Sequence, residues 1–376
     1  MKTGWQTKKL GDVATLQRGF DLPRQDRSSG DVPLVTSSGI SDTVSKSAVD
    51  GPGVATGRSG SIGNVFFIEE DFWPLNTVLY VKDFHGNDPR FVFHLLKDFD
   101  LKRFATGTGV PTLNRNCVHD ELVNVPPLAE QQRIVGLLDE AFEGLATAKA
   151  NAEKNLQNAR ALFESHLQSI FTQRGPGWVA KRLEDIADAD CSLSYGIVQP
   201  GEEFDEGMPI VRPTDLTSKV IRLTGLKRID PKLAEGYKRT TLQGGELLLC
   251  VRGSTGVISI ASTELVGANV TRGIVPIRFN RSLLLSEFGF HLLSGGPVQR
   301  QIREKTYGTA LMQINIRDLR LISLSIPPLN EQRAIAAKLD SLYEETQRLA
   351  RLYERKLAVL EALKRSLLHQ AFSGEL

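Results

Sequence analysis

The side chains that most often carry out catalysis do not form a recognisable set in this sequence. Cys117, Cys191 and Cys250 are far apart and odd in number, which argues against a disulfide framework and a thiolate zinc site. The six histidines never form a His-x-x-x-His pair, and neither a phosphate-binding loop with its lysine nor a Gly-x-Ser-x-Gly elbow occurs. The sequence therefore implies no metal and no bound cofactor, and the common catalytic signatures are missing.

Composition indicates a folded protein of several domains. At roughly 150 residues per domain, 376 residues predict two to three folding units. Hydrophobic residues make up 41% and charged residues 24%, and no apolar run reaches the length of a membrane span, so we expect a cytoplasmic protein without a membrane anchor. The net charge of +2 neither requires nor excludes a nucleic-acid partner, because binding depends on where the charges lie.

The chain contains an internal repeat. Residues 107–139 align without a gap onto residues 308–340 at an offset of 201, and shorter matches continue upstream, from Phe91 and Phe288 back to Trp5 and Trp178. The offsets grow from 173 to 201, which places insertions in the second copy. The largest insertion lies between the match of Pro33 with Pro209 and the match of Gly60 with Gly253. Segments 38–56 and 214–249 therefore differ most, and we expect one scaffold with two different recognition surfaces.

Each copy is predicted to end in a long helix. From Leu128 and from Leu329, apolar residues recur at heptad spacing without an internal proline, and a Pro-Pro pair stands directly ahead of each stretch. One seam is rich in alanine and the other in leucine, which suits an antiparallel pair with the globular parts at opposite ends. Asn155 and Lys356 fall at equivalent seam positions. Either they fix the register of the pair or the seam drifts and both are solvated.

We therefore predict four segments and a mixed fold. Residues 1–127 and 175–328 are expected to be globular α/β (α+β) domains, because short apolar runs alternate with turn clusters and a helical stretch. Residues 128–174 and 329–376 are expected to be the two halves of an antiparallel coiled coil.

The repeated helix start carries a family resemblance. Pro-Pro-Leu-x-Glu-Gln-x-x-Ile occurs from Pro126 and again from Pro327, each time opening a long helix, and YGIVQPG begins at Tyr195. In these motifs, and over essentially its whole length, the chain resembles the specificity subunit of type I restriction–modification systems.

The resemblance implies a non-catalytic subunit that binds double-stranded DNA. In such a subunit each of the two recognition domains reads one half of a bipartite, asymmetric site, and the helices set the gap between the halves. It would dock two methyltransferase subunits, which would hold S-adenosylmethionine, and restriction (translocase) subunits would join that core. Two alternatives remain: a coiled-coil adaptor that does not bind DNA, and a fused nuclease or methyltransferase. Against the second, Asn124-Val-Pro-Pro-Leu128 has an extra valine and lacks the aromatic residue of adenine methyltransferase motifs.

The resemblance does not assign the base-reading residues, so we predict them by chemistry. Arginine can contact guanine and Asn or Gln adenine, while Ser and Thr commonly hold phosphates. The candidates in turn-rich segments of the first domain are Arg18, Arg24, Gln25, Arg27, Ser37, Ser38, Lys46, Arg58, Ser59 and Asn64. Those of the second domain are Tyr195, Arg212, Thr214, Lys219, Arg239, Arg252, Ser254, Thr255 and Arg272. The loop Gly57–Asn64 is either a close backbone approach to DNA or a plain β-turn.

Two further expectations concern repeated polar residues. Glu130, Gln131, Glu331 and Gln332 either cap their helices or contact the methyltransferase. His94 and His291 recur in equivalent Phe-His-Leu-Leu helices, which indicates packing rather than catalysis.

Overall fold

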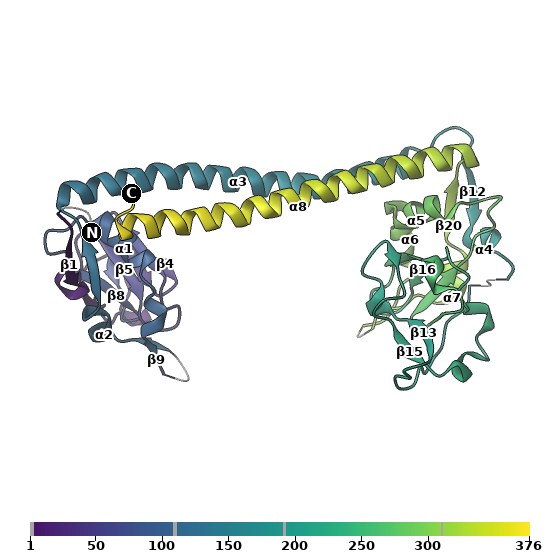
Figure 1. Ribbon diagram of the computed structural model, residues 1–376, viewed down its shortest axis with the longest axis horizontal. Helices are drawn as coiled ribbons and strands as arrows, with labels where there is room; N and C mark the ends of the chain where they lie inside the picture. Colours follow the sequence, from purple (N-terminus) through teal and green to yellow (C-terminus); the bar gives the residue numbers. More distant parts are fainter. Residues whose placement is uncertain (1–3, 108–110, 191–192, 310) are drawn as a thin grey trace. The chain divides into compact units, whose positions relative to one another are not determined.

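The computed structural model describes residues 4–107, 111–190, 193–309 and 311–376 (Figure 1). The chain forms two compact units, Met1–Lys154 with Tyr353–Leu376, and Asn155–Leu352. Each unit therefore contains one globular domain and a part of both long helices. Cys191 lies outside the described residues, while Cys117 is a free, exposed thiol and Cys250 a free, buried one.

The first domain is built from short strands and few helices. Its strands are β1 (Gln6–Lys9), β2 (Thr15–Arg18), β3 (Val32–Thr36), β4 (Gly39–Val44), β5 (Gly53–Gly57), β6 (Val65–Ile68), β7 (Trp73–Pro74), β8 (Val78–Asp83), β9 (Ala105–Thr106), β10 (Thr112–Leu113) and β11 (Leu122–Val125). Its helices are α1 (Pro89–Asp98) and α2 (Arg115–His119), with the 3-10 helices η1 (Leu10–Asp12), η2 (Arg24–Asp26) and η3 (Leu101–Phe104). An antiparallel sheet has the order β2-β8-β5-β6, a smaller sheet has the order β4-β3-β7, and β1–β11 and β9–β10 form pairs.

The larger sheet of this domain is buried on both faces. Along β8, Leu79 and Val81 join the core that contains α1, whereas Val78 and Tyr80 join a second core shared with β3 of the smaller sheet. Because successive side chains of a strand point to opposite faces, a strand between two cores must be apolar at every position. The apolar run over residues 78–81 of β8 therefore follows from its central place, and the exposed Lys82 and Asp83 end the strand.

The second domain has a longer list of elements. Its strands are β12 (Val179–Arg182), β13 (Met208–Val211), β14 (Val220–Ile221), β15 (Lys227–Ile229), β16 (Leu247–Cys250), β17 (Ile258–Ala261), β18 (Asn269–Val270), β19 (Ile274–Ile277) and β20 (Ser323–Ile326). Its helices are α4 (Leu183–Ile186), α5 (Ser286–Ser294), α6 (Gly296–Glu304) and α7 (Ile316–Arg320), with the 3-10 helices η4 (Pro213–Asp215), η5 (Pro231–Ala234), η6 (Lys238–Thr240) and η7 (Thr263–Leu265). The sheets have the orders β14-β17-β16-β19 and β15-β13-β18, and β12 pairs with β20.

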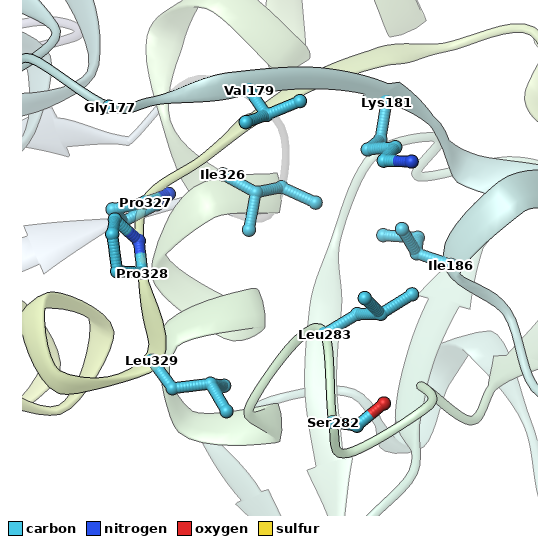
Figure 2. Close-up of a pocket in the computed structure, with 10 residues that line it drawn as sticks. All are labelled: Gly177, Val179, Lys181, Ile186, Ser282, Leu283, Ile326, Pro327, Pro328 and Leu329. Atoms are coloured by element: carbon cyan, nitrogen blue, oxygen red, sulfur yellow. The ribbon is translucent and has the colours of Figure 1, made fainter.

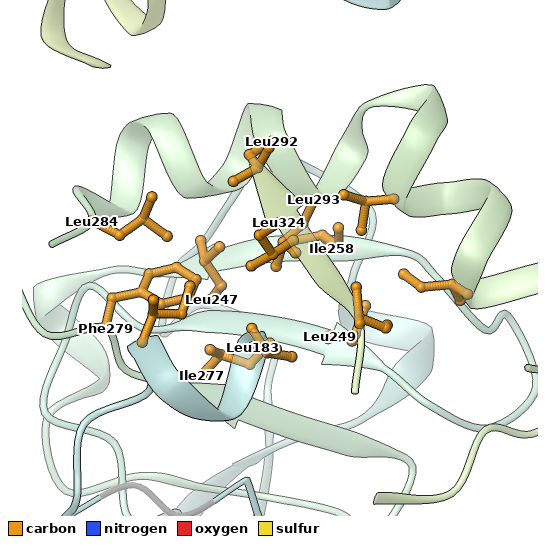
Figure 3. Packing of buried hydrophobic residues seen from close by; sticks show 14 of the residues in the cluster. Leu183, Leu247, Leu249, Ile258, Ile277, Phe279, Leu284, Leu292, Leu293 and Leu324 are labelled. Atoms are coloured by element: carbon orange, nitrogen blue, oxygen red, sulfur yellow. The ribbon is translucent and has the colours of Figure 1, made fainter. Parts of the chain in front are cut away.

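The two domains share one topology, which confirms the repeat seen in the sequence. In both smaller sheets the middle strand has one antiparallel and one parallel neighbour: β4 and β7 flank β3, and β15 and β18 flank β13. The buried strand β16 again divides its side chains between two cores, with Leu247 and Leu249 in one and Leu248 and Cys250 in the other. Figure 3 shows the first of these cores, where Leu247 and Leu249 lie beneath Leu292 and Leu293 of α5. The extra edge strand β14 lies in the segment 214–249 that the repeat alignment marks as inserted.

The long helices α3 (Leu128–Gln173) and α8 (Leu329–Ser373) begin directly after their Pro-Pro pairs, as predicted. In the first unit the start of α3 packs against the end of α8, and Ile134 and Phe372 share one core. In the second unit the end of α3 packs against the start of α8, with the rings of Phe163 and Tyr343 5.2 Å apart. The start of each helix thus meets the end of the other, so the predicted antiparallel pairing is confirmed. None of the described helices is long and apolar enough to cross a membrane.

One of the two predicted heptad rows leaves the interface midway along each helix, whereas Ala152 and Ala159 of the other row stay buried. Asn155 and Lys356 are exposed, and so are the next predicted seam residues, Leu162 and Leu363. A straight α-helix has 3.6 residues per turn, so a strict seven-residue row rotates by about 20° per heptad out of the interface. Of the two alternatives for Asn155 and Lys356, the structure therefore favours solvated residues on a drifting seam.

Candidate nucleic-acid interface

The loop that follows β5 in the first domain and the loop that follows β16 in the second domain have the same backbone pairing. After β5, Leu113 N–H donates to Arg58 O at 2.8 Å, and Ser59 forms a bridge with Thr112. After β16, Ile314 N–H donates to Val251 O at 3.0 Å, and Arg252 forms a bridge with Gln313. The two loops are therefore equivalent frames that carry different side chains.

In the second domain this frame borders a cavity of about 330 Å³. Three of the predicted DNA-binding residues, Tyr195, Arg252 and Arg272, line it together with Tyr307 and Gln313. The two tyrosines are 41% and 49% exposed, so the cavity has an aromatic rim. The structure brings these predicted residues together although they are spread over nearly eighty positions of the chain.

The arginines of this cavity are available to a ligand. Among the described residues, neither Arg252 nor Arg272 has an acidic partner, and no hydrogen bond of either guanidinium is present. By contrast, Asp215 binds the guanidinium of Arg212 through two hydrogen bonds of 2.9 and 3.1 Å. A guanidinium without a protein partner retains its full set of donors for a base edge or a phosphate.

The other predicted residues of the second domain lie on neighbouring loops. Thr255 Oγ1 donates to Met312 O at 3.1 Å, next to Gln313, and Ser254 beside it is exposed. Arg212 and Thr214 lie at η4, which approaches the loop of Arg272 closely, because a Cβ on Gly273 would come within 2.7 Å of Pro213. Arg239 lies on η6 and is not among the residues that line the cavity.

Lys219 forms contacts inside the domain, and contact with DNA stays a prediction for this residue. Its Nζ pairs with the carboxylate of Asp340 on α8 and lies 5.2 Å from the centre of the Phe290 ring. The sequence placed Lys219 in a loop, but only the fold shows that this loop packs against the long helix.

In the first domain a cluster of polar residues lies around the equivalent loop. The guanidinium of Arg18 donates to both oxygens of Asp21, at 3.1 and 3.2 Å, and Asn76 donates to the same carboxylate. Arg58 Nη1 donates to Asn76 O at 3.4 Å. Arg18 and Arg58, predicted separately, are therefore linked through Asp21 and Asn76.

Two of the predicted serines, Ser37 and Ser59, lie near Arg58 through backbone contacts. Ser59 N–H donates to Thr77 O, and the backbone of Gly57 passes close to Ser37. A Cβ on Gly57 would lie 2.0 Å from Ser61 O, so glycine permits this tight loop. The loop from Gly57 is thus a tight turn over a shared strand frame, at a position where a backbone could approach a ligand closely.

The remaining predicted residues of the first domain lie around this group. Ser38 Oγ is 3.2 Å from Thr36 Oγ1, Asn64 ends the loop, and Arg27 Nε donates to Leu22 O. The exposed residues that complete the set are Arg24, Gln25 and Lys46.

The helix starts are tied to their domains by two buried glutamines. Gln131 is 2% exposed: its Nε2 donates to Asn87 Oδ1 at 2.8 Å and to Pro126 O at 2.9 Å, and its Oε1 accepts from Asp88 N–H at 2.9 Å. Gln332 is fully buried: its Nε2 donates to Leu283 O and Pro327 O, and its Oε1 accepts from Leu285 N–H. Their amides are already used, so the structure does not favour these two side chains as partner contacts.

The neighbouring glutamates are more accessible. Glu130 pairs with Arg133 at 2.7 Å, and Glu331 accepts a hydrogen bond of 2.8 Å from Trp178 Nε1. Both lie partly exposed at the start of their helix, so contact with a partner stays a prediction for Glu130 and Glu331.

The repeated histidines join each domain to its long helix. His94 Nε2 lies 3.1 Å from Asp139 of α3, and His291 Nε2 lies 2.6 Å from Asp340 of α8. Burial lowers the pKa of both imidazoles despite the carboxylate beside each. Burial by itself would raise the pKa of Asp340, but hydrogen bonds from Lys219 and His291 outweigh it and lower that pKa. These contacts agree with a packing role for the histidines.

Sequence reasoning missed four residues of these surfaces: Asn76, Thr112, Tyr307 and Gln313. Thr112 and Gln313 occupy the same position of the gapless repeat alignment. The two polar residues differ there, although the surrounding stretch is similar in both copies. That contrast was the available signal. It needed the structure to show that this stretch borders the loop of Ser59 and Arg252.

Comparison with protein families identifies one match over most of the chain. The family described as "Type I restriction modification DNA specificity domain" matches residues 2–156 and again residues 176–355. The chain is 24% identical to the EcoBI specificity subunit of a type I restriction enzyme from Escherichia coli, over 76% of this chain and 65% of that protein. It is 22% identical to the EcoDI specificity subunit of the same organism, over 99% of this chain and 88% of that protein.

Solved structures share the fold. The HsdS subunit from Thermoanaerobacter tengcongensis superposes with a TM-score of 0.64 at 20% identity, covering 100% of this chain and 98% of that chain. A chain from a structure titled for complex assembly and conformational transition of the type I R-M system superposes with a TM-score of 0.78, also at 20% identity, covering 100% and 99%.

Proposed function

The chain belongs to the family of type I restriction–modification DNA specificity subunits, and from this premise we propose that each of its two domains reads one half of a bipartite site in double-stranded DNA. The specificity subunit is the non-catalytic component of such a system. The site is asymmetric, because the two domains are unlike where they would meet DNA.

The observation that carries this proposal is the shared loop frame with different side chains. The first domain presents Ser59 and Thr112 where the second presents Arg252 and Gln313. Arginine and glutamine suit the major-groove edges of guanine and adenine, whereas serine and threonine make shorter, less selective contacts. Two readers of different chemistry in one chain recognise two different half-sites.

The two long helices suit both the gap between the half-sites and the docking of partner subunits in the proposed complex. Two equivalent helix starts offer two equivalent docking positions, which suits two copies of a methyltransferase subunit. Beside the start of α8, Val179, Ile326 and Pro327 line an apolar cavity of about 250 Å³ (Figure 2). S-adenosylmethionine would be held by the methyltransferase, restriction subunits would join the same core, and α3 with α8 would set the gap between the half-sites. Because its substrate is cellular DNA, we place the complex in the cytoplasm.

The test is to express the chain with the methyltransferase subunit of its own host in a strain without other adenine methylation, and to map methylated adenines across the genome. We expect one motif with two defined halves and a fixed gap. Methylation at ungapped motifs, or none when both proteins are present and soluble, would refute the proposal.

Binding by the purified complex gives a second measurement. Affinity for a duplex with the mapped motif should fall as salt rises, because phosphate contacts release counterions. The chain without its partners should neither transfer methyl groups nor cut DNA. A salt-independent, sequence-independent response would favour a coiled-coil adaptor.

A further inference from the structure

We infer that Gln313, with Arg252 and Tyr307 beside it, determines the bases that the second domain accepts, and that it reads the major-groove edge of a purine. The inference rests on the proposed function and goes further, because it names the specificity-determining positions and the class of base. The three residues are separated along the chain but meet at one cavity.

Backbone pairing fixes how these residues meet. Gln313 exchanges two hydrogen bonds of 2.9 Å with Tyr307, and its other edge forms a bridge with Arg252. A residue held by its main chain on both sides has a fixed Cα position, so its side chain can change without moving the frame.

The first domain has the same arrangement with other side chains. There Thr112 pairs with Thr106 on one edge and forms a bridge with Ser59 on the other. The repeat alignment sets Thr112 opposite Gln313 at an offset of 201, and the same offset continued one residue upstream sets Thr106 opposite Tyr307. The same backbone frame therefore carries Arg252, Gln313 and Tyr307 in the second domain and Ser59, Thr112 and Thr106 in the first.

The side-chain polar groups of Gln313 and Arg252 bind no other group within the part of the chain that the structure describes. No hydrogen bond of the Gln313 amide or of the Arg252 guanidinium is present there, although both line the cavity. The buried Gln332, in contrast, uses its amide fully. A polar side chain that lines a cavity and binds nothing in its own protein is free to bind a ligand.

The chemistry of the cavity suits a purine edge. The Gln amide can donate to N7 and accept from N6 of adenine, and a guanidinium can donate twice to O6 and N7 of guanine. Arg252 and Arg272 supply such donors, and the exposed rings of Tyr195 and Tyr307 form the rim. Thr112 of the first domain has a single hydroxyl and a methyl group, which can contact either a polar edge or a thymine methyl.

The experiment exchanges residues between the two frames. Gln313→Thr gives the second domain the residue of the first, and Thr112→Gln is the reverse change. Each variant is expressed with the host's own methyltransferase subunit, and methylated adenines are mapped as for the unchanged chain. The matched control is Gln243→Thr, because Gln243 is exposed and lines a different cavity.

We expect Gln313→Thr to relax or change one base position in one half-site only, with discrimination at that position reduced by about 5- to 150-fold, as for the loss of one bidentate contact. Thr112→Gln should change the other half-site, and Gln243→Thr neither. Unchanged motifs in both exchange variants would overturn the inference. So would a complete loss of methylation in Gln313→Thr, because the first domain folds with threonine on the same frame. If the unchanged chain gives no gapped motif, the proposed function itself fails.

Discussion

Replacing Gln332 by alanine should selectively destabilise the unit that contains the second domain. The side chain joins the first turn of α8 to the loop before α5 through two donated hydrogen bonds of 2.8 and 2.9 Å and one accepted bond of 3.0 Å. All three partners are backbone groups, and the glutamine is fully buried. Alanine would leave Leu283 O, Pro327 O and Leu285 N–H without this partner.

The expected loss follows from these three bonds. A buried hydrogen bond contributes about 1 kcal/mol net, and a buried polar group left without a partner costs ~1–3 kcal/mol. We therefore expect the free energy of unfolding of this unit to fall by about 3–5 kcal/mol. For a unit of this size, each kcal/mol lowers Tm by about 2–4 °C, so the shift should be on the order of 10 °C.

The measurement is urea unfolding of the full chain followed by the fluorescence of Trp178. The sequence has three tryptophans, so Trp5→Phe and Trp73→Phe leave Trp178 as the reporter of its own unit. Trp178 donates to Glu331, next to the substituted residue, and its ring contacts Phe171 and Phe288. Gln347→Ala, at an exposed position of α8, is the control. A midpoint change no larger than that of the control would refute the assignment of Gln332 as a joint between helix and domain.

Three other predictions follow from the contacts. Burial lowers the folded-state pKa of His94 and His291 below that of the unfolded chain, so unfolding takes up protons at acidic pH. Unfolding free energy should therefore decrease as pH falls from about 7 towards 5, and a His94→Gln, His291→Gln chain should show a flatter profile in urea titrations at each pH. Lys219→Met should lower the free energy of unfolding by about 1 kcal/mol, because the pair with Asp340 is lost. The methylated motif should stay unchanged, and an altered motif would indicate that Lys219 contacts DNA. Arg58→Ala should weaken discrimination in the same half-site as Thr112→Gln, measured by methylation mapping, and leave the other half-site intact.

Some of the site could be predicted from the sequence and some could not. Arginine, serine and tyrosine in turn-rich segments are recognisable by type, and Tyr195, Arg252 and Arg272 were selected in this way. Their assembly into one cavity, and the inclusion of Tyr307 and Gln313, depends on pairing between strands that are distant in sequence. The same limit applies to the contact of Lys219 with α8, since a loop residue shows no sign in sequence of the helix on which it packs.

The duplication, the starts of the two long helices and the α/β character of both domains can be predicted from the amino-acid sequence. Each of these features depends on residues that are close together in sequence: a repeated motif, a Pro-Pro pair ahead of a heptad pattern, and apolar runs of strand length. The folded chain was needed to show that Gln131 and Gln332 are buried, that Asn155 and Lys356 are solvated, and which polar residues converge on each loop frame. Burial and convergence depend on contacts between segments far apart in the chain, and side-chain type and spacing do not specify those contacts.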